Sequence, residues 1–147
     1  PGSATCLIQE LESTTKPVVR CLACGHRIKN AQRCSGCNRE FPSKPYRLEF
    51  IDGPAANQSF LIPDGVFECG RYQLCPGDLR ISRRQLGIGC GNGLWIRNAT
   101  NPPPPNPTLI NGLPANESIL VTEGTKISIA DNDAVVRAAP PKSSPFN

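Results

Sequence analysis

Two pairs of cysteines are the residues of this chain whose type and spacing most clearly predict chemistry. Cys21 and Cys24 form one Cys-x-x-Cys pair, Cys34 and Cys37 form a second, and nine residues separate the pairs. Thiolate sulfur is a preferred ligand of Zn²⁺, and each such turn presents two sulfurs to one metal ion. Because four cysteines complete a tetrahedral shell and leave no position for substrate or water, we expect a structural zinc ion.

The segment that holds these cysteines, residues 20–41, resembles the short zinc-ribbon modules that are common in prokaryotic proteins. Gly25 and Gly36 supply the tight backbone of its two turns. A module of this size buries too little apolar surface to fold alone, so the metal should be its main source of stability. His26 lies two residues after Cys24 and could replace a ligand, but with four cysteines present we expect it to face solvent or to lie behind the ligands. Two disulfides or free thiols are the alternative to a metal.

The positive charge of the chain belongs to its N-terminal third. Residues 1–47 carry eight Lys and Arg against three Glu, whereas residues 48–147 carry eight Lys and Arg against nine acidic residues. Cations of the cysteine segment could contact nucleic-acid phosphates; they are Arg20, Arg27, Lys29, Arg33 and Arg39. No aromatic residue that could stack on a base lies among them, so we favour a solvated basic surface or a rigid spacer that docks another protein. Nucleic-acid binding remains an alternative function.

The other features of the composition predict a reducing, cytoplasmic location. The remaining cysteines (Cys6, Cys69, Cys75 and Cys90) show no regular spacing, and no signal peptide is visible. No apolar run approaches the roughly 20 residues that a membrane-spanning helix needs. Cys69 and Cys75 lie close in sequence to a basic loop that could lower a thiol pKa. We interpret them as packing cysteines rather than reactive ones.

Catalysis is the least favoured class of function. The only histidine, His26, lies inside the cysteine segment. The sequence holds no paired-carboxylate cluster, no Gly-Lys-Ser/Thr loop that would cradle phosphate and no nucleophile motif. We therefore expect a binding protein and not an enzyme.

The elements that must position any site beyond residue 45 are short strands. Apolar runs of three to six residues alternate with turn residues at regular intervals, a pattern typical of a β-sandwich or barrel. The runs are 46–51, 59–62, 66–69, 85–88, 94–97, 108–110, 119–121, 126–129 and 134–137. No stretch of this half supports a helix of three turns. The sequence therefore predicts an all-β domain.

The changes of composition along the chain predict five segments. Residues 1–19 form an N-terminal segment in which a short helix and a short strand are both plausible. The zinc ribbon at 20–41 is followed by a stiff linker at 42–45, the β domain at 46–139 and a Pro-rich tail at 140–147 that we expect to be disordered. A second Pro-rich stretch, inside the β domain, is expected to be an extended loop.

The β domain carries a series of short motifs in a fixed order between the expected strands. They are Gly-Arg at 70–71, Ser-Arg-Arg-Gln at 82–85, Asn-Ala-Thr-Asn at 98–101 and Asn-Gly at 111–112, followed by Leu-Val-Thr-Glu-Gly-Thr-Lys-Ile at 120–127. This order resembles the forkhead-associated (FHA) domain. The resemblance covers residues 46–139 and implies an eleven-stranded β-sandwich whose loops at one end hold a phosphothreonine.

The resemblance also implies roles for individual residues. Arg71 would grip the phosphate, Ser82 would donate its hydroxyl and backbone amide, and Arg83 would add charge. Thr100 and Asn101 would line the site, and the Asn101 side chain would pair with the ligand backbone. These residue types suit a phosphate, which carries nearly two negative charges and three strong acceptor oxygens.

Two departures from the family pattern lie beside this site. Gln85 stands where the family has a His that braces the loop; Gln can donate and accept hydrogen bonds, but its side chain is longer and more flexible. After Asn101 the family's Gly is replaced by the run 102–107, Pro-Pro-Pro-Pro-Asn-Pro. A stiff insertion at this edge could narrow or redirect the site.

The resemblance implies a protein that binds phosphothreonine in a partner protein, as an adaptor in a kinase or phosphatase signalling system. Arg80 and Arg84 should raise the positive potential of the site, while Asp78 should oppose it. The alternative is a phosphorylation-independent scaffold that keeps the fold and docks partners elsewhere on its surface.

Overall fold

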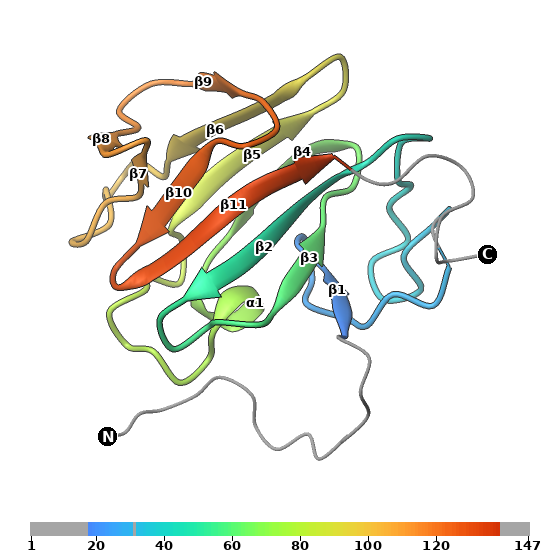
Figure 1. Cartoon of the computed structure of the whole chain (residues 1–147), viewed down its shortest axis with the longest axis horizontal. Helices are drawn as coiled ribbons and strands as arrows, with labels where there is room; N and C mark the ends of the chain where they lie inside the picture. Colours follow the sequence, from blue (N-terminus) through green and yellow to red (C-terminus); the bar gives the residue numbers. More distant parts are fainter. Residues whose placement is uncertain (1–17, 31, 139–147) are drawn as a thin grey trace.

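The computed structural model describes residues 18–30 and 32–138 (Figure 1). The expectations for residues 1–17 and for the tail at 140–147 lie outside the described residues. Within the described part, no helix has the length and apolar character needed to cross a membrane.

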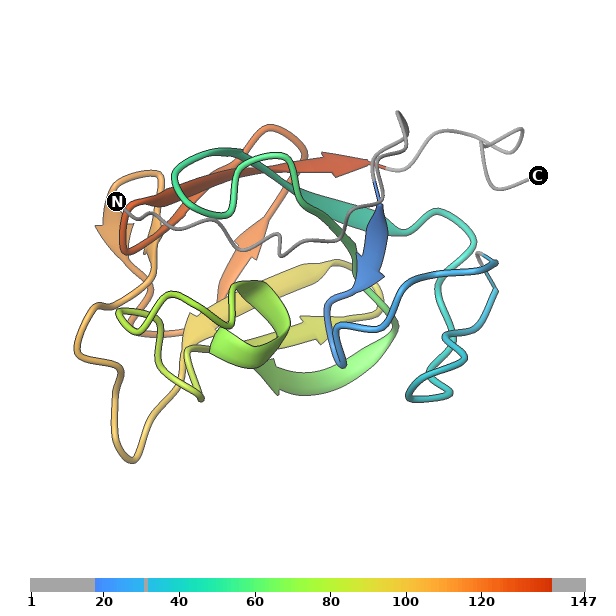
Figure 2. The same cartoon turned by 90° about the horizontal axis from the view of Figure 1, so that it is seen from below.

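Two β-sheets pack face to face, as the alternating sequence predicts (Figures 1 and 2). The larger sheet has seven strands in the order β1 (Val19–Cys21), β3 (Ser59–Leu61), β2 (Tyr46–Asp52), β11 (Asn132–Ala138), β10 (Lys126–Ile129), β7 (Leu109–Ile110) and β8 (Leu113–Pro114). The smaller sheet has four, in the order β4 (Gly65–Cys69), β5 (Leu86–Cys90), β6 (Leu94–Asn98) and β9 (Ile119–Val121). The expected all-β sandwich is confirmed.

The core lies between the sheets because successive residues of a strand point to opposite faces. In β2, Leu48 and Phe50 are buried between residues that are more exposed, and in β6 Leu94 and Ile96 alternate with more exposed side chains. The ring of Phe50 meets that of Phe60 edge to face at 6.0 Å between centroids. This continuous apolar layer fixes the strand ends, and therefore the loops that leave them.

The cysteine segment is joined to the sandwich through strand β1. β1 pairs in parallel with β3 and forms one edge of the larger sheet. Beyond the strand, the Leu22 N–H donates to the Leu61 carbonyl at 3.0 Å, and the Leu22 side chain is fully buried in the main core. The described residues contain eleven strands, and one of them therefore comes from the cysteine module rather than from residues 46–139.

Two short elements were not expected from the sequence. Strand β8 pairs with β7 across Asn111 and Gly112, which have φ values of 50° and 87°, the left-handed conformation that a two-residue hairpin turn requires. Helix α1 (Arg71–Leu74) is a single turn after β4. Neither element is long enough to produce a hydrophobic period in the sequence.

Candidate functional site

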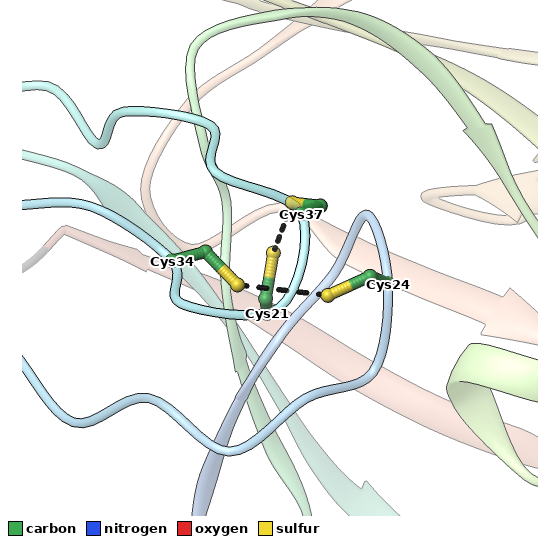
Figure 3. A group of neighbouring side chains, drawn as sticks. All are labelled: Cys21, Cys24, Cys34 and Cys37. Atoms are coloured by element: carbon green, nitrogen blue, oxygen red, sulfur yellow. Dashed lines mark hydrogen bonds between the residues drawn. The ribbon is translucent and has the colours of Figure 1, made fainter.

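The four cysteines of the N-terminal module converge on one point. Their sulfur atoms all lie within 4.8 Å of one another, with 3.5 Å between Cys24 Sγ and Cys34 Sγ and 3.9 Å between Cys21 Sγ and Cys37 Sγ (Figure 3). Tetrahedral zinc with Zn–S bonds of about 2.3 Å places its sulfurs about 3.8 Å apart. A disulfide needs about 2.05 Å. The donor set therefore fits a metal ion and excludes disulfides among these four.

The backbone of the module holds the sulfurs in this arrangement. The Gly25 N–H donates to the Cys21 carbonyl at 2.7 Å, and the Asn38 N–H donates to the Cys34 carbonyl at 2.8 Å, so each cysteine pair sits on a tight turn. The Gly36 N–H points at Cys34 Sγ at 3.3 Å. Burial raises the pKa of the Cys21 thiol. A bound cation would favour the thiolate and oppose that effect.

The module has its own small apolar cluster at the junction with the sandwich. Cys21, Cys34, Phe41 and Leu61 are buried together in it. His26 is exposed, and its β-carbon packs so closely on Gly36 that a side chain at position 36 would collide with it. His26 is not among the grouped metal-binding residues, so its side chain supports the turn from outside.

Several of the module's cations, Arg33 and Arg39 among them, are engaged within the protein. Arg33 donates to the Glu40 carboxylate at 2.6 Å, and the Arg39 guanidinium lies 5.2 Å from the centre of the Phe67 ring. These arginines therefore have partners within the protein.

At one end of the sandwich, the Gly-Arg segment after β4 packs against the loop before β5. The Arg71 N–H donates to the Ser82 carbonyl at 2.9 Å, which places the backbones of these two residues side by side. Gly70 makes this approach possible: a β-carbon there would collide with the carbonyl oxygens of Ser82 and Arg83. The glycine of the Gly-Arg motif is therefore required at position 70 for a steric reason.

Gln85 braces this loop. Its side chain is fully buried, and its Oε1 accepts from the Ser82 N–H at 2.9 Å. Its Nε2 donates to the Asn106 carbonyl at 2.8 Å and to Thr108 Oγ1 at 3.1 Å. The amide can donate and accept at once, so it ties the 82–85 loop to the Pro-rich insertion. This bond also uses the Ser82 N–H that the resemblance offered to a phosphate.

The Pro-rich insertion at 102–107 folds back onto the same loop. Asn98, fully hydrogen-bonded inside the sandwich, accepts from the Thr108 N–H at 2.7 Å and donates to the Thr108 carbonyl at 3.2 Å. The Asn106 side chain donates to the Arg80 carbonyl at 3.1 Å. Sequence reasoning missed Asn98 and Asn106 as bracing residues. The one amide side chain within a proline run was the available signal for Asn106.

The charges at this end are distributed unevenly. Arg80 forms ion pairs with Asp78 and Asp131, and Arg84 pairs with Glu68 at 2.8 Å. The Arg80 guanidinium holds the pKa of the Asp78 carboxyl below its usual range. Asp78 opposes the charge of Arg80 as expected, but the expectation that Arg80 and Arg84 raise the positive potential of the site is wrong, because carboxylates pair with both.

Arg71 and Arg83 differ from these two arginines. Within residues 18–30 and 32–138, neither of them forms an ion pair. The Arg71 guanidinium lies 5.6 Å from the centre of the Tyr72 ring, and Arg71 is half-buried while Arg83 is exposed. An arginine without a carboxylate partner is available to an anion.

Thr100 and Asn101 lie in the loop that follows β6, and both are exposed. The Asn101 carbonyl accepts from Arg84 at 3.1 Å, and the Ala99 N–H donates to the Gln85 carbonyl at 3.1 Å. The β6 loop is thus hydrogen-bonded to the 82–85 loop, which is bonded to Arg71. The five predicted residues therefore lie on α1 and on the two loops that these hydrogen bonds connect to each other and to it.

Neither cysteine next to this end is an activated thiol, but the interpretation of Cys75 as an ordinary packing cysteine is wrong, because Cys75 is disulfide-bonded. Cys69 is buried in the core, and burial raises the pKa of its thiol to about 12. For Cys69, the alternative of a thiol activated by the neighbouring basic loop is wrong, because removal from water and the nearby Glu68 carboxylate both raise the pKa of its thiol.

The sandwich is similar in structure to several solved FHA domains. An FHA domain studied for phosphothreonine-dependent interactions is 23% identical, with 65% of this chain and 98% of that chain covered and a TM-score of 0.54. An Arabidopsis thaliana FHA domain is also 23% identical, with coverages of 69% and 91% and a TM-score of 0.57. The sandwich has the forkhead-associated fold.

A third FHA structure, the FhaA domain in complex with the intracellular domain of another protein, is 23% identical with a TM-score of 0.53 and covers 63% of this chain and 99% of that one. No family model matches the sequence. No curated protein matches it either. The likeness to FHA domains is therefore one of fold.

Proposed function

We propose that this chain is a binding module for phosphothreonine-containing segments of partner proteins, acting as an adaptor in a kinase or phosphatase signalling system. The observation that carries the proposal is the pairing of Arg71 with Ser82 across the Gly70 contact. This contact holds the backbones of the two residues side by side, Ser82 is half-buried, and the Arg71 guanidinium has no carboxylate partner among the described residues.

The chemistry of these loops suits a phosphate dianion. The Arg71 guanidinium supplies a charged fork, and the Ser82 hydroxyl supplies a neutral donor. Arg83 adds charge from the same loop. Thr100 and Asn101 would line the site from the loop after β6, and the Asn101 side chain would pair with the ligand backbone. Because carboxylates occupy Arg80 and Arg84, the affinity would depend mainly on Arg71 and Arg83.

The domain division fits this role. We propose that residues 46–139 form the phosphopeptide module, and that residues 20–41 hold a structural Zn²⁺ through Cys21, Cys24, Cys34 and Cys37. When bound, zinc supplies a tetrahedral crosslink between the two turns. The fold neighbours support a binding role: one was studied for phosphothreonine-dependent interactions and another was solved with a protein partner.

Arg71→Ala is expected to weaken the binding of a phosphothreonine peptide by about 30-fold or more, because a charged partner of the phosphate is removed. Peptides selected from an oriented phosphothreonine library are titrated calorimetrically into the zinc-loaded chain, each beside its unphosphorylated form. The matched control is Arg137→Ala, which removes the same charge from β11, where Arg137 pairs with Glu49.

The control variant should bind like the unaltered chain, and the unphosphorylated peptides should not bind measurably. Equal affinity for both forms of the peptide would contradict the proposal, and so would an Arg71→Ala variant that binds as well as the control.

A second candidate function, phosphorylation-independent assembly, is favoured by the outer face of the smaller sheet. Gly87 and Gly89 leave a groove of about 270 Å³ there, beside the half-exposed Trp95. Val66, on the neighbouring strand, is 81% exposed. A partner that docks here would bind Arg71→Ala as well as the unaltered chain and would lose affinity for Trp95→Ala.

A further inference from the structure

One side chain, Gln73, connects the cysteine module to the proposed phosphate-binding loops. Gln73 lies in α1, between the two regions, and uses both ends of its amide. Its Nε2 donates to the Ala23 carbonyl at 3.2 Å, and its Oε1 accepts from the Gly70 N–H at 2.9 Å. The two partners are separated by more than forty residues of sequence and belong to different parts of the fold.

On the side of the module, Gln73 contacts the turn that presents two of the metal ligands. Ala23 lies between Cys21 and Cys24, so the direction of its carbonyl depends on how that turn is held. A β-carbon at Gly25 would lie 3.5 Å from the Gln73 Cα, which shows that the turn packs on the backbone of α1. A metal bound to both cysteines would fix the turn, and with it the acceptor of the Gln73 amide.

On the side of the sandwich, Gln73 sets the start of α1. The Gly70 N–H is an amide at the beginning of a helical turn, where no backbone acceptor within the turn is available. The next residue, Arg71, donates its N–H to the Ser82 carbonyl at 2.9 Å. The Gln73 side chain therefore holds the residue that precedes the guanidinium proposed to bind phosphate.

We infer that Gln73 is a positioning residue that couples metal binding in the cysteine module to phosphopeptide binding at the loops. The inference rests on the proposed phosphothreonine function. With zinc bound, the Ala23 carbonyl is held in place, Gln73 is fixed at both ends, and the Gly70–Arg71 backbone is ordered before the peptide arrives. Because coupling between two binding sites is reciprocal, a bound peptide must also tighten zinc binding.

The test measures this reciprocity in the full 147-residue chain. Zinc affinity is determined by competition with a chromogenic chelator, with and without a saturating phosphothreonine peptide chosen by the library titration. The unaltered chain is expected to bind zinc about 10-fold more tightly when the peptide is present. Gln73→Met keeps the length of the side chain and loses both hydrogen bonds. In this variant the ratio of zinc affinity with peptide to zinc affinity without peptide should fall to about one.

Two further variants separate the coupling from a general loss of order. Gln73→Glu keeps an acceptor for the Gly70 N–H but has no donor for the Ala23 carbonyl, so its ratio should also be near one. Gln58→Met is the matched control: Gln58 Nε2 also donates to a carbonyl of α1, that of Leu74 at 3.4 Å, and has no bond to the cysteine module. Its ratio should equal that of the unaltered chain. Amide NMR spectra identify folded variants, and Gln73→Glu replaces Gln73→Met if the latter is unfolded.

The outcomes distinguish this inference from the function on which it rests. If the zinc-loaded chain binds no phosphothreonine peptide, the proposed function fails and the inference fails with it. If the chain binds the peptide but zinc affinity does not change, the inference alone is overturned. A full ratio retained in a folded Gln73 variant would also overturn it, because some other contact would then carry the coupling.

Discussion

Removal of the metal is expected to disorder the cysteine module and to lower the melting temperature of the whole chain by about 10 °C or more. Structural zinc contributes an apparent binding free energy of about 10 kcal/mol or more in small modules. A module of this size buries too little apolar surface to replace that contribution. The effect should reach the sandwich because β1 belongs to its larger sheet and Leu22 to its main core.

The experiment uses metal analysis and thermal unfolding of the same samples. The chain should contain one zinc ion per molecule and lose it to a strong chelator. Cys34→Ser should retain well under one equivalent and melt early. The matched control is Cys90→Ser, which alters a buried free cysteine outside the cluster. It should keep its zinc, and chelation should lower its melting temperature as it does for the unaltered chain.

A chelated sample that melts like the zinc-loaded one would contradict this account of the module. A Cys90→Ser variant that loses zinc as readily as Cys34→Ser would contradict it as well.

Gly70→Ala is expected to be the most destabilising small substitution in the sandwich, with a loss of about 3 kcal/mol in the free energy of unfolding. The added methyl group would meet the carbonyl oxygens of Ser82 and Arg83. These are backbone atoms of the braced loop and cannot move aside as a side chain can. The loops would have to separate, which would break the bond between the Arg71 N–H and the Ser82 carbonyl.

Gly77→Ala is the matched control, because Gly77 belongs to the same loop region and a β-carbon there would meet no atom within 4 Å. Its stability should stay within about 0.5 kcal/mol of the unaltered chain. Chemical unfolding monitored by the fluorescence of the single tryptophan, Trp95, measures both variants. Equal midpoints for Gly70→Ala and Gly77→Ala would show that the loops do not pack as closely as described.

Much of the sandwich could be predicted from the sequence because the information is local. Strands β9 and β10 have the bounds that the sequence predicts, since each is an alternating run closed by turn residues. The sulfur cluster was equally accessible, because two Cys-x-x-Cys turns at short separation bring four ligands together with few other possibilities.

The features that could not be predicted depend on contacts between distant segments. Nothing in residues 19–21 indicates that β1 pairs with β3 rather than lying free, because three residues carry no periodicity. The neutralisation of Arg84 by Glu68 depends on the alignment of two elements that are separated in sequence.

Gln85 illustrates the same limit within the proposed site. By type it differs from the residue that the FHA pattern has at this position, which suggested a weaker brace. In the structure its amide makes three hydrogen bonds, and one of them goes to the Asn106 carbonyl of the Pro-rich insertion, an acceptor that the sequence pattern alone does not reveal. The two departures from the pattern therefore act together as one brace.

The most direct test of the central claim is to map peptide binding on the amide NMR spectrum of the zinc-loaded chain. We expect a phosphothreonine peptide to shift the amides of Arg71, Ser82, Thr100 and Asn101, and its unphosphorylated form to leave them unchanged. Shifts of equal size with both peptides, centred on Trp95 and its sheet face, would contradict phosphothreonine recognition by these loops.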